Sequence, residues 1–308
     1  MIRGIVIAGL CLLLIAAPRV SADVETDRKV DSLFLRASSP EQKYQHLVTP
    51  SREELGKMGI EAVPRLIEKI ETEDARERHA LDDIFKRIGP VAVPALVEAL
   101  DTVNEDGVKN AARCLGQIGD KSATPALLKL FDADKHSIRS TAVTAVGKCH
   151  DSSAVQECVD MLGDTVENVR KCAAVALGRI KHPDANPSLI EALDDPHFSV
   201  RMSSVRALSQ IGEEACVRLI ASYDTLSSLA KSLAFEVWAN VEFRDSRKAL
   251  ERETKSEDPL MRAFAIYSLA RVDPGKAAKT VRRMLKTETD LFVISRIEAA
   301  QVLIETQR

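Results

Sequence analysis

Aromatic side chains are scarce in this chain of 308 residues, at 4% of the composition. Surfaces that bind single-stranded nucleic acid commonly stack bases on aromatic rings, so this scarcity argues against such a surface. Basic residues are not in excess either, because the formal net charge is -3 at pH 7. Affinity for a phosphate backbone depends on many cationic contacts. We therefore expect no nucleic-acid partner.

The motifs of common catalytic and metal sites are also missing. The histidines are dispersed, and the chain has no Cys-x-x-Cys pair, no His-Glu dipeptide, no glycine-rich phosphate loop and no Gly-x-Ser-x-Gly elbow. Cys114 and Cys216 have no base nearby in the sequence that would mark either as a nucleophile. The sequence predicts a protein that is not an enzyme, with no catalytic residue, no metal site and no cofactor.

No apolar run is long enough to span a membrane easily. The longest extends from Gly4 to Ala17, and as a helix it reaches about 21 Å, against about 30 Å for the hydrocarbon core of a bilayer. Arg3 precedes this run, and Val20-Ser21-Ala22 follows it as a small-residue cleavage site. These features predict a secretory signal peptide over residues 1–22, cleaved near Ala22. The mature protein is expected in the periplasm or outside the cell, without stable membrane insertion.

What the chain does contain is a repeat of about 31 residues. Two independent sets of residues recur with this spacing. The first set is Val108-Lys109, Ile138-Arg139, Val169-Arg170, Val200-Arg201, Ala230-Lys231 and Met261-Arg262, and the second is Pro64, Pro94, Pro125 and Pro187. Two sets with one period indicate a repeat architecture.

Each repeat has the pattern of two helices joined by a turn. In one unit, Pro125 is predicted as the first residue of the first helix, residues 132–137 form the turn, and the second helix extends from Ile138 to Gly147. Helices this short are marginal alone in water, so each pair is expected to gain stability by packing on both neighbours. The sequence predicts an all-α fold, a right-handed α-solenoid of stacked helix pairs.

The unit with the clearest pattern contains Val169-Arg170 followed by Ala173-Ala174-Val175-Ala176-Leu177-Gly178. This pattern resembles HEAT-like repeats, in particular the short type found in bilin-lyase subunits. The resemblance extends over residues 59–304, as seven or eight units that become less regular after Gly212. HEAT-like di-iron hydroxylases depend on repeated His-Glu pairs, so their oxygen chemistry is not expected here. Residues 23–58 are predicted to form an N-terminal helical cap, with a helix that starts in a capping box from Ser51 to Glu54.

An Arg or Lys begins each predicted second helix. Acidic residues five to seven positions earlier, such as Asp134 before Arg139 and Asp164 before Arg170, lie in the turn, where a carboxylate can pair with a guanidinium between helices and with neighbouring units. In proteins with this resemblance such pairs are structural, so we interpret these residues as a stabilising ladder. A basic stripe that binds a ligand is the alternative.

The cysteines that follow the predicted signal peptide number five, and therefore at least one lies outside any disulfide. Cys149 and Cys158 occupy positions that hold Ile or Leu in other repeats, so both are interpreted as small buried hydrophobic residues. A Cys149–Cys158 bridge is the alternative.

Positions that vary between repeats are released from packing and are available for recognition. In the second helices, positions six and ten residues after the opening Val share one face. HEAT-like arrays line their concave side with the second helices, so the resemblance places this face in a groove. The predicted partner-binding residues are Lys148, Arg179, Arg206, Glu236, Tyr267 and Arg271.

These observations predict an exported scaffold or adaptor that binds a protein or peptide along the concave face. One alternative is an accessory subunit or chaperone, similar to bilin-lyase subunits, that handles a cofactor or a client protein. Another is a structural component of the cell envelope.

Overall fold

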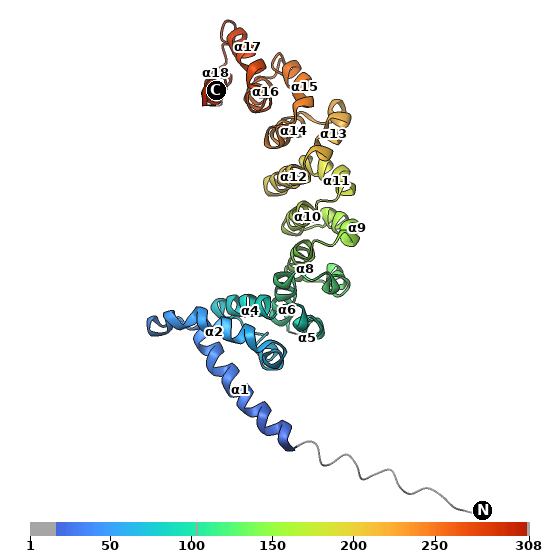
Figure 1. The fold of residues 1–308 in the computed structure, drawn as a ribbon. Coiled ribbons are helices and arrows are strands. Elements are labelled where there is room, and N and C mark those ends of the chain that lie inside the picture. Colours follow the sequence, from blue (N-terminus) through green and yellow to red (C-terminus); the bar gives the residue numbers. More distant parts are fainter. Residues whose placement is uncertain (1–16, 103, 307–308) are drawn as a thin grey trace, which may run out of the picture. The chain divides into compact units, whose positions relative to one another are not determined.

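A computed structural model of the chain describes residues 17–102 and 104–306. All regular structure within these residues is helical, and no strand occurs among them. The prediction of an all-α solenoid is confirmed, because short helices follow one another in pairs and the pairs stack (Figure 1). None of the described helices is both long and apolar enough to cross a membrane. Most of the predicted signal peptide lies outside the described residues, and its predicted cleavage site at Ala22 falls within the first helix.

The contacts divide the chain into two compact units, residues 1–126 and residues 127–308. Unit 1 holds α1 (Ala17–Ser38), α2 (Gln45–Met58), α3 (Val63–Ile67), α4 (Ala75–Ile88), α5 (Val93–Glu98) and α6 (Glu105–Ile118). The boundary falls in α7 (Thr124–Leu128). Unit 2 holds α8 (His136–Cys149), α9 (Val155–Asp160), α10 (Glu167–Ile180), α11 (Asn186–Glu191), α12 (Phe198–Ile211), α13 (Glu213–Ser222), α14 (Ser228–Val241), α15 (Arg247–Glu253), α16 (Pro259–Val272), α17 (Pro274–Met284) and α18 (Leu291–Thr306).

The helices before the repeats, α1 and α2, pack on each other. The predicted helix start at Ser51 is wrong, because α2 begins at Gln45 and continues through Pro50. Proline lacks an N–H and costs the helix interior a hydrogen bond. Packing compensates for this loss, since Ser51 and Leu55 are buried on a helix that contacts both α1 and α4.

The first helices α5, α7, α9 and α11 are shorter than the sequence predicts, because 3-10 turns flank them. Pro125 is the second residue of α7 and not the first, since the 3-10 segment Lys121–Ala123 comes before it. Asp120 caps this segment, and its carboxylate accepts a hydrogen bond from the N–H of Ser122 at 2.8 Å. The chain therefore turns into the helix earlier than the proline indicates.

The second helices of unit 2 pack closely against one another where small residues meet. A Cβ atom added to Gly147 in α8 would lie 2.6 Å from the Cα atom of Ala176 in α10. One added to Gly178 in α10 would lie 2.8 Å from the Cα atom of Ala207 in α12. Glycine at these positions therefore permits a backbone approach that other side chains would block. In Figure 1 the layer of second helices, α8 to α16, lies on the inner side of the bend of unit 2, and the first helices lie on the outer side.

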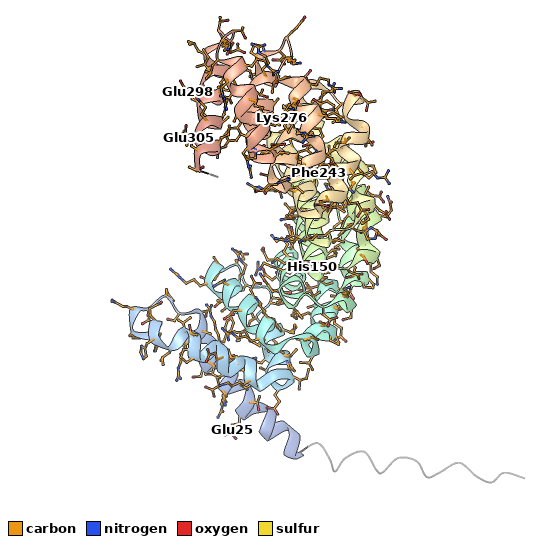
Figure 2. The ribbon with its side chains drawn as sticks, turned by 45° about the horizontal axis from the view of Figure 1, so that its top comes forward. Glu25, His150, Phe243, Lys276, Glu298 and Glu305 are labelled. Atoms are coloured by element: carbon orange, nitrogen blue, oxygen red, sulfur yellow. The ribbon has the colours of Figure 1, made fainter. Side chains whose placement is uncertain are left out.

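The last helix of unit 2, α18, packs on α16 and α17. Terminal repeats have a neighbour on one side alone. The exposed residues of α18 include Glu298 and Glu305 (Figure 2) together with the apolar Leu291 and Val302.

Candidate functional site

The six residues predicted to bind a partner lie on consecutive second helices of unit 2. Each of these helices packs on the next one. On α12, residues on both sides of Arg206 are buried while Arg206 is exposed, so its side chain lies on the free face of that helix. The helices and residues are α8 with Lys148, α10 with Arg179, α12 with Arg206, α14 with Glu236, and α16 with Tyr267 and Arg271. The structure thus places all six on one helical layer, and their binding role stays a prediction.

These side chains differ in how deeply they are buried. Arg206 and Glu236 are exposed, whereas Lys148 and Arg179 are half-buried. The Nη1 atom of Arg179 is buried and has no hydrogen-bond acceptor among the described residues. A buried donor without an acceptor costs free energy. An incoming acceptor group would recover that cost.

The C-terminal part of this layer is linked across repeats. Arg271 donates from Nη1 to the side-chain oxygen of Asn240 at 3.1 Å, and the Asn240 amide donates to Oγ of Ser209 at 3.4 Å. The guanidinium of Arg296, on α18, lies 5.7 Å from the ring centroid of Tyr267. Tyr267 therefore takes part in packing. The variation between repeats at this position predicts that it would not. Asn240 shares the repeat position of Arg271 but is not one of the six predicted binding residues, and nothing in the repeat pattern indicates Arg296.

Three of the basic residues that begin the second helices form a ladder between repeats. In three rungs the guanidinium donates from Nε and Nη2 to one carboxylate, at 2.7 to 3.1 Å. The carboxylate belongs to the turn of the next repeat, and the rungs are Arg139–Asp164, Arg170–Asp195 and Arg262–Glu288. The arginine contacts its own turn through backbone carbonyl groups, as Arg139 does with Asp134 at 3.1 Å. Each such arginine therefore fastens its own turn to the following one.

The ladder carboxylates are held in their ionised form. Burial opposes ionisation of Asp164, but hydrogen bonds from Arg139 and from the N–H of Val166 outweigh burial and lower its pKa. Burial and Arg170 act in the same opposed way on Asp195, and its pKa is also lowered. These shifts support the structural interpretation of the ladder.

Two of the buried cysteines, Cys158 and Cys216, lack the properties of nucleophiles. Burial raises the pKa of Cys158 and of Cys216 to about 12, so both are thiols at neutral pH. Cys149 and Cys158 are buried and are not joined, so the alternative of a bridge between them is not realised. Within the described residues, His, Cys, Asp and Glu side chains form no group of three that could hold a metal ion.

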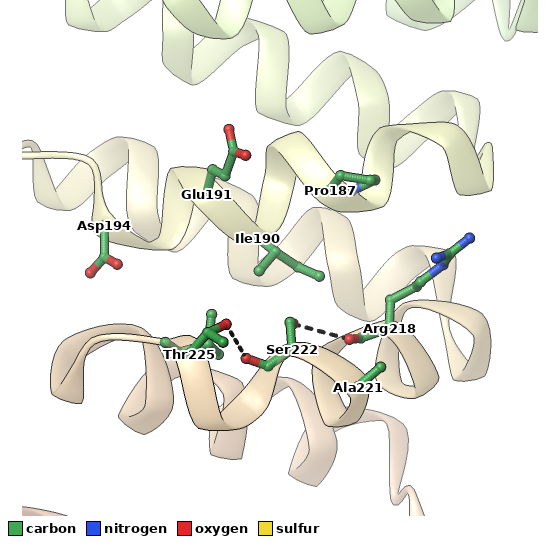
Figure 3. A pocket seen from close by; sticks show the side chains of 9 residues that line it. Pro187, Ile190, Glu191, Asp194, Arg218, Ala221, Ser222 and Thr225 are labelled. Atoms are coloured by element: carbon green, nitrogen blue, oxygen red, sulfur yellow. Dashed lines mark hydrogen bonds between the residues drawn. The ribbon is translucent and has the colours of Figure 1, made fainter.

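A groove that the sequence did not predict lies in the outer layer, between α11 and α13 (Figure 3). Its volume is about 510 Å³. Acidic side chains line it along α11 and its following turn, and Arg218 lines it from α13. The remaining lining includes Ile190, Ser222, Thr225 and Leu226.

The family model for HEAT repeats matches residues 63–147, 135–209 and 158–238, which together make up more than half of the chain. The chain belongs to the HEAT-repeat family. The predicted resemblance to HEAT-like repeats is confirmed by this match. No curated protein matches the sequence.

Solved structures similar to this HEAT-repeat chain are also helical solenoids. The Kap95:Nup1 complex is 16% identical with a TM-score of 0.56, over 95% of this chain and 48% of Kap95. Kap95p, the yeast importin-β, in its complex with RanGDP is 15% identical with a TM-score of 0.55, over 92% and 47%. The CpcE–CpcF complex of phycocyanin lyase from Nostoc sp. PCC7120 is 17% identical with a TM-score of 0.43, over 80% and 94%. The chain spans about half the length of Kap95p, and identities this low establish the fold alone.

Proposed function

We propose that this HEAT-repeat chain is an exported, non-enzymatic scaffold or adaptor that binds a segment of another protein along the inner layer of second helices in unit 2. The observation that carries the proposal is the inner-layer face of α10 and α12, where Arg206 is exposed and half-buried Arg179 has a guanidinium nitrogen without an acceptor among the described residues. Arginine is among the side chains that contribute most at protein interfaces. Kap95p binds Ran and Nup1 in its solved complexes, which supports a protein partner for this fold.

The charge of this layer favours an acidic segment. Arg179, Arg206 and Arg271 outnumber Glu236 among its predicted contact residues, although the whole chain has a net charge of -3. Opposite charges on two partners raise their association rate and suppress wrong partners. Binding is therefore expected to weaken as salt is added, since exposed charges are screened over about 8 Å at physiological ionic strength.

The experiment compares two charge-reversal variants in affinity capture from the exported fraction. Arg179→Glu/Arg206→Glu changes the inner layer, and Lys248→Glu/Arg282→Glu is the matched control, because both of its residues are exposed on first helices. We expect the inner-layer variant to lose a stoichiometric partner that the native chain and the control variant retain. Equal helical content by circular dichroism shows that all three chains are folded.

Two results would contradict the proposal. If both variants lost the partner equally, binding would follow net charge and not the inner layer. If both retained it, the binding surface would lie elsewhere on the chain.

A further inference from the structure

Each complete rung of the arginine ladder uses the guanidinium in the same way. Nη1 donates to carbonyl oxygens of the arginine's own turn, and Nε and Nη2 together donate to one carboxylate of the next turn. For Arg170 the two carbonyl groups are those of Asp164 and Thr165, at 2.9 and 3.3 Å, and the carboxylate is that of Asp195. The carbonyl contacts thus orient Nε and Nη2, the two donors that bind the carboxylate.

Arg201 has the same orientation but lacks the carboxylate. Its Nη1 donates to the carbonyl oxygens of Asp195 and Pro196 at 2.8 and 3.0 Å. Its Nε and Nη2 have no acceptor within the part of the chain that the structure describes. Nε and Nη2 of Arg201 are both accessible to solvent. Arg201 therefore presents an oriented and unoccupied pair of donors.

Arg201 has no carboxylate partner among the described residues because the residue at the matching position of the next turn is a leucine. Leu226 follows Arg201 by the same number of residues as Asp195 follows Arg170. Its backbone angles are φ -70° and ψ 149°, close to φ -55° and ψ 138° at Asp195. The Asp194 carboxylate accepts a hydrogen bond from Oγ of Ser227 at 2.5 Å and makes no hydrogen bond with Arg201. The backbone at this position thus matches that of a complete rung, but the Leu226 side chain supplies no acceptor.

An exposed aromatic ring lies beside the same guanidinium. Phe198 is 68% exposed, and the guanidinium carbon of Arg201 is 5.7 Å from the centroid of its ring. The corresponding residues at the start of α8 and α10 are His136 and Glu167. An exposed ring of this size costs free energy in water unless another surface covers it. It adds an apolar contact next to the two free donors.

We propose that Arg201 and Phe198 form a recognition site for a peptide carboxylate with a neighbouring apolar side chain. The carboxylate would take the place that Asp164 and Asp195 hold in the complete rungs, and would accept hydrogen bonds from Nε and Nη2. Such paired, charge-assisted bonds are short and specific in geometry. The site lies at the start of α12 and uses none of the inner-layer residues of the proposed function.

The test follows the arginine Nε–H signals of the full chain by nuclear magnetic resonance, with Arg201→Lys used to assign the signal. The probe is sodium acetate, added against sodium chloride at equal ionic strength. We expect a saturable shift of the Arg201 signal, while the Arg139 and Arg170 signals stay in place because their rungs are full. An Arg201 signal that does not move with acetate would overturn the proposal, and so would equal movement of all three signals.

A second variant fills the rung from within the chain. Leu226→Asp is expected to move the Arg201 signal to the position typical of the complete rungs, to weaken acetate binding at least tenfold, and to raise the unfolding midpoint by about 2 °C. Leu226→Asn has a similar size without the charge and should retain acetate binding. If Leu226→Asp left acetate binding unchanged, the carboxylate would not bind where the ladder places it, and the proposal would fail.

Peptides distinguish the two sources of a carboxylate. One peptide has blocked ends and an internal Phe-Asp pair, and the other has a free C-terminal carboxylate after Phe and no acidic side chain. Preferential binding of either one names the source and supports the site. If neither bound more tightly than acetate, the apolar contact with Phe198 would be wrong.

Discussion

At the residue scale, a carboxylate in the following repeat decides whether an arginine at the start of a second helix is paired. The sequence indicates that Arg139 and Arg170 pair with carboxylates of the turns, and the structure agrees that they are structural. The pattern names Asp134, five residues before Arg139, whereas the carboxylate that pairs with Arg139 is that of Asp164 in the next repeat. In the structure the carbonyl group of Asp134 and the carboxylate of Asp164 both accept from Arg139. The direction of a side chain between stacked repeats depends on packing that spacing alone does not specify.

A complete rung should contribute measurably to stability. Asp195→Ala removes the partner of Arg170, whose side chain is 12% exposed, and leaves its donors unsatisfied. We expect the free energy of unfolding to fall by about 1.5 to 3 kcal/mol, the range for hydrogen bonds to charged groups. Chemical denaturation measures the change. Asp194→Ala, at the neighbouring exposed position, is the control and should cost less.

The ladder also predicts how stability depends on pH. The pKa values of Asp164, Asp195 and Glu288 are lower in the folded chain than in the unfolded chain. Their stabilisation is therefore complete above an unfolded pKa of about 4 and is lost as the pH falls through the lower folded values. Unfolding midpoints measured between about pH 2 and 7 should fall on the acid side, and less steeply in Asp164→Ala/Asp195→Ala. A stability that rose on acidification would contradict this prediction.

At the element scale, the second helices follow the sequence more closely than the first helices do. The predicted second helix from Ile138 lies within α8, because small and apolar residues recur there with a helical period. The first helices are divided into 3-10 and α segments, such as Lys121–Ala123 and α7, and a proline does not indicate where the 3-10 part begins. The predicted start at Ser51 failed for a related reason, since packing holds α2 together across Pro50.

The close approach of α8 and α10 predicts a strong effect of a small substitution. In Gly147→Ala the new methyl group would meet backbone and Cβ atoms of Ala176 at 2.6 and 2.7 Å. The helices would have to separate, and we expect a loss of about 1 to 3 kcal/mol in the free energy of unfolding. Gly163→Ala is the matched control, because no atom lies within 4 Å of its new methyl group. Equal midpoints for the two variants in thermal unfolding would show that this contact does not limit the helix spacing.

At the scale of the whole molecule, the repeat period alone does not show how the chain divides. The spacing of repeats continues evenly through Pro125 and Ile138, whereas the contacts separate two units after Ala126. The period depends on which residues recur, and the division depends on how their side chains pack. The inner-layer residues were found from variation between repeats, and all six lie in unit 2.

Export is a separate prediction for the whole chain. Cleavage after Ala22 would release a protein that begins at Asp23 and would remove residues 17–22 from α1. We expect N-terminal sequencing of the protein from the exported fraction to start at Asp23. A substitution of Ala22 by Arg should leave the longer chain, because the cleavage site requires small residues. A chain that keeps Met1 and stays in the cytoplasm would exclude a cleaved signal peptide.

Site-specific photocrosslinking in the producing cells locates a bound partner on the inner or the outer layer of unit 2. A photoreactive residue replaces Gln210 or Glu236 on the inner layer, or Val217 or Lys248 on the outer layer, and all four positions are exposed. We expect one discrete protein adduct from positions 210 and 236 and none from positions 217 and 248. Adducts from the outer positions alone would contradict the proposed function and would place the partner on the first helices.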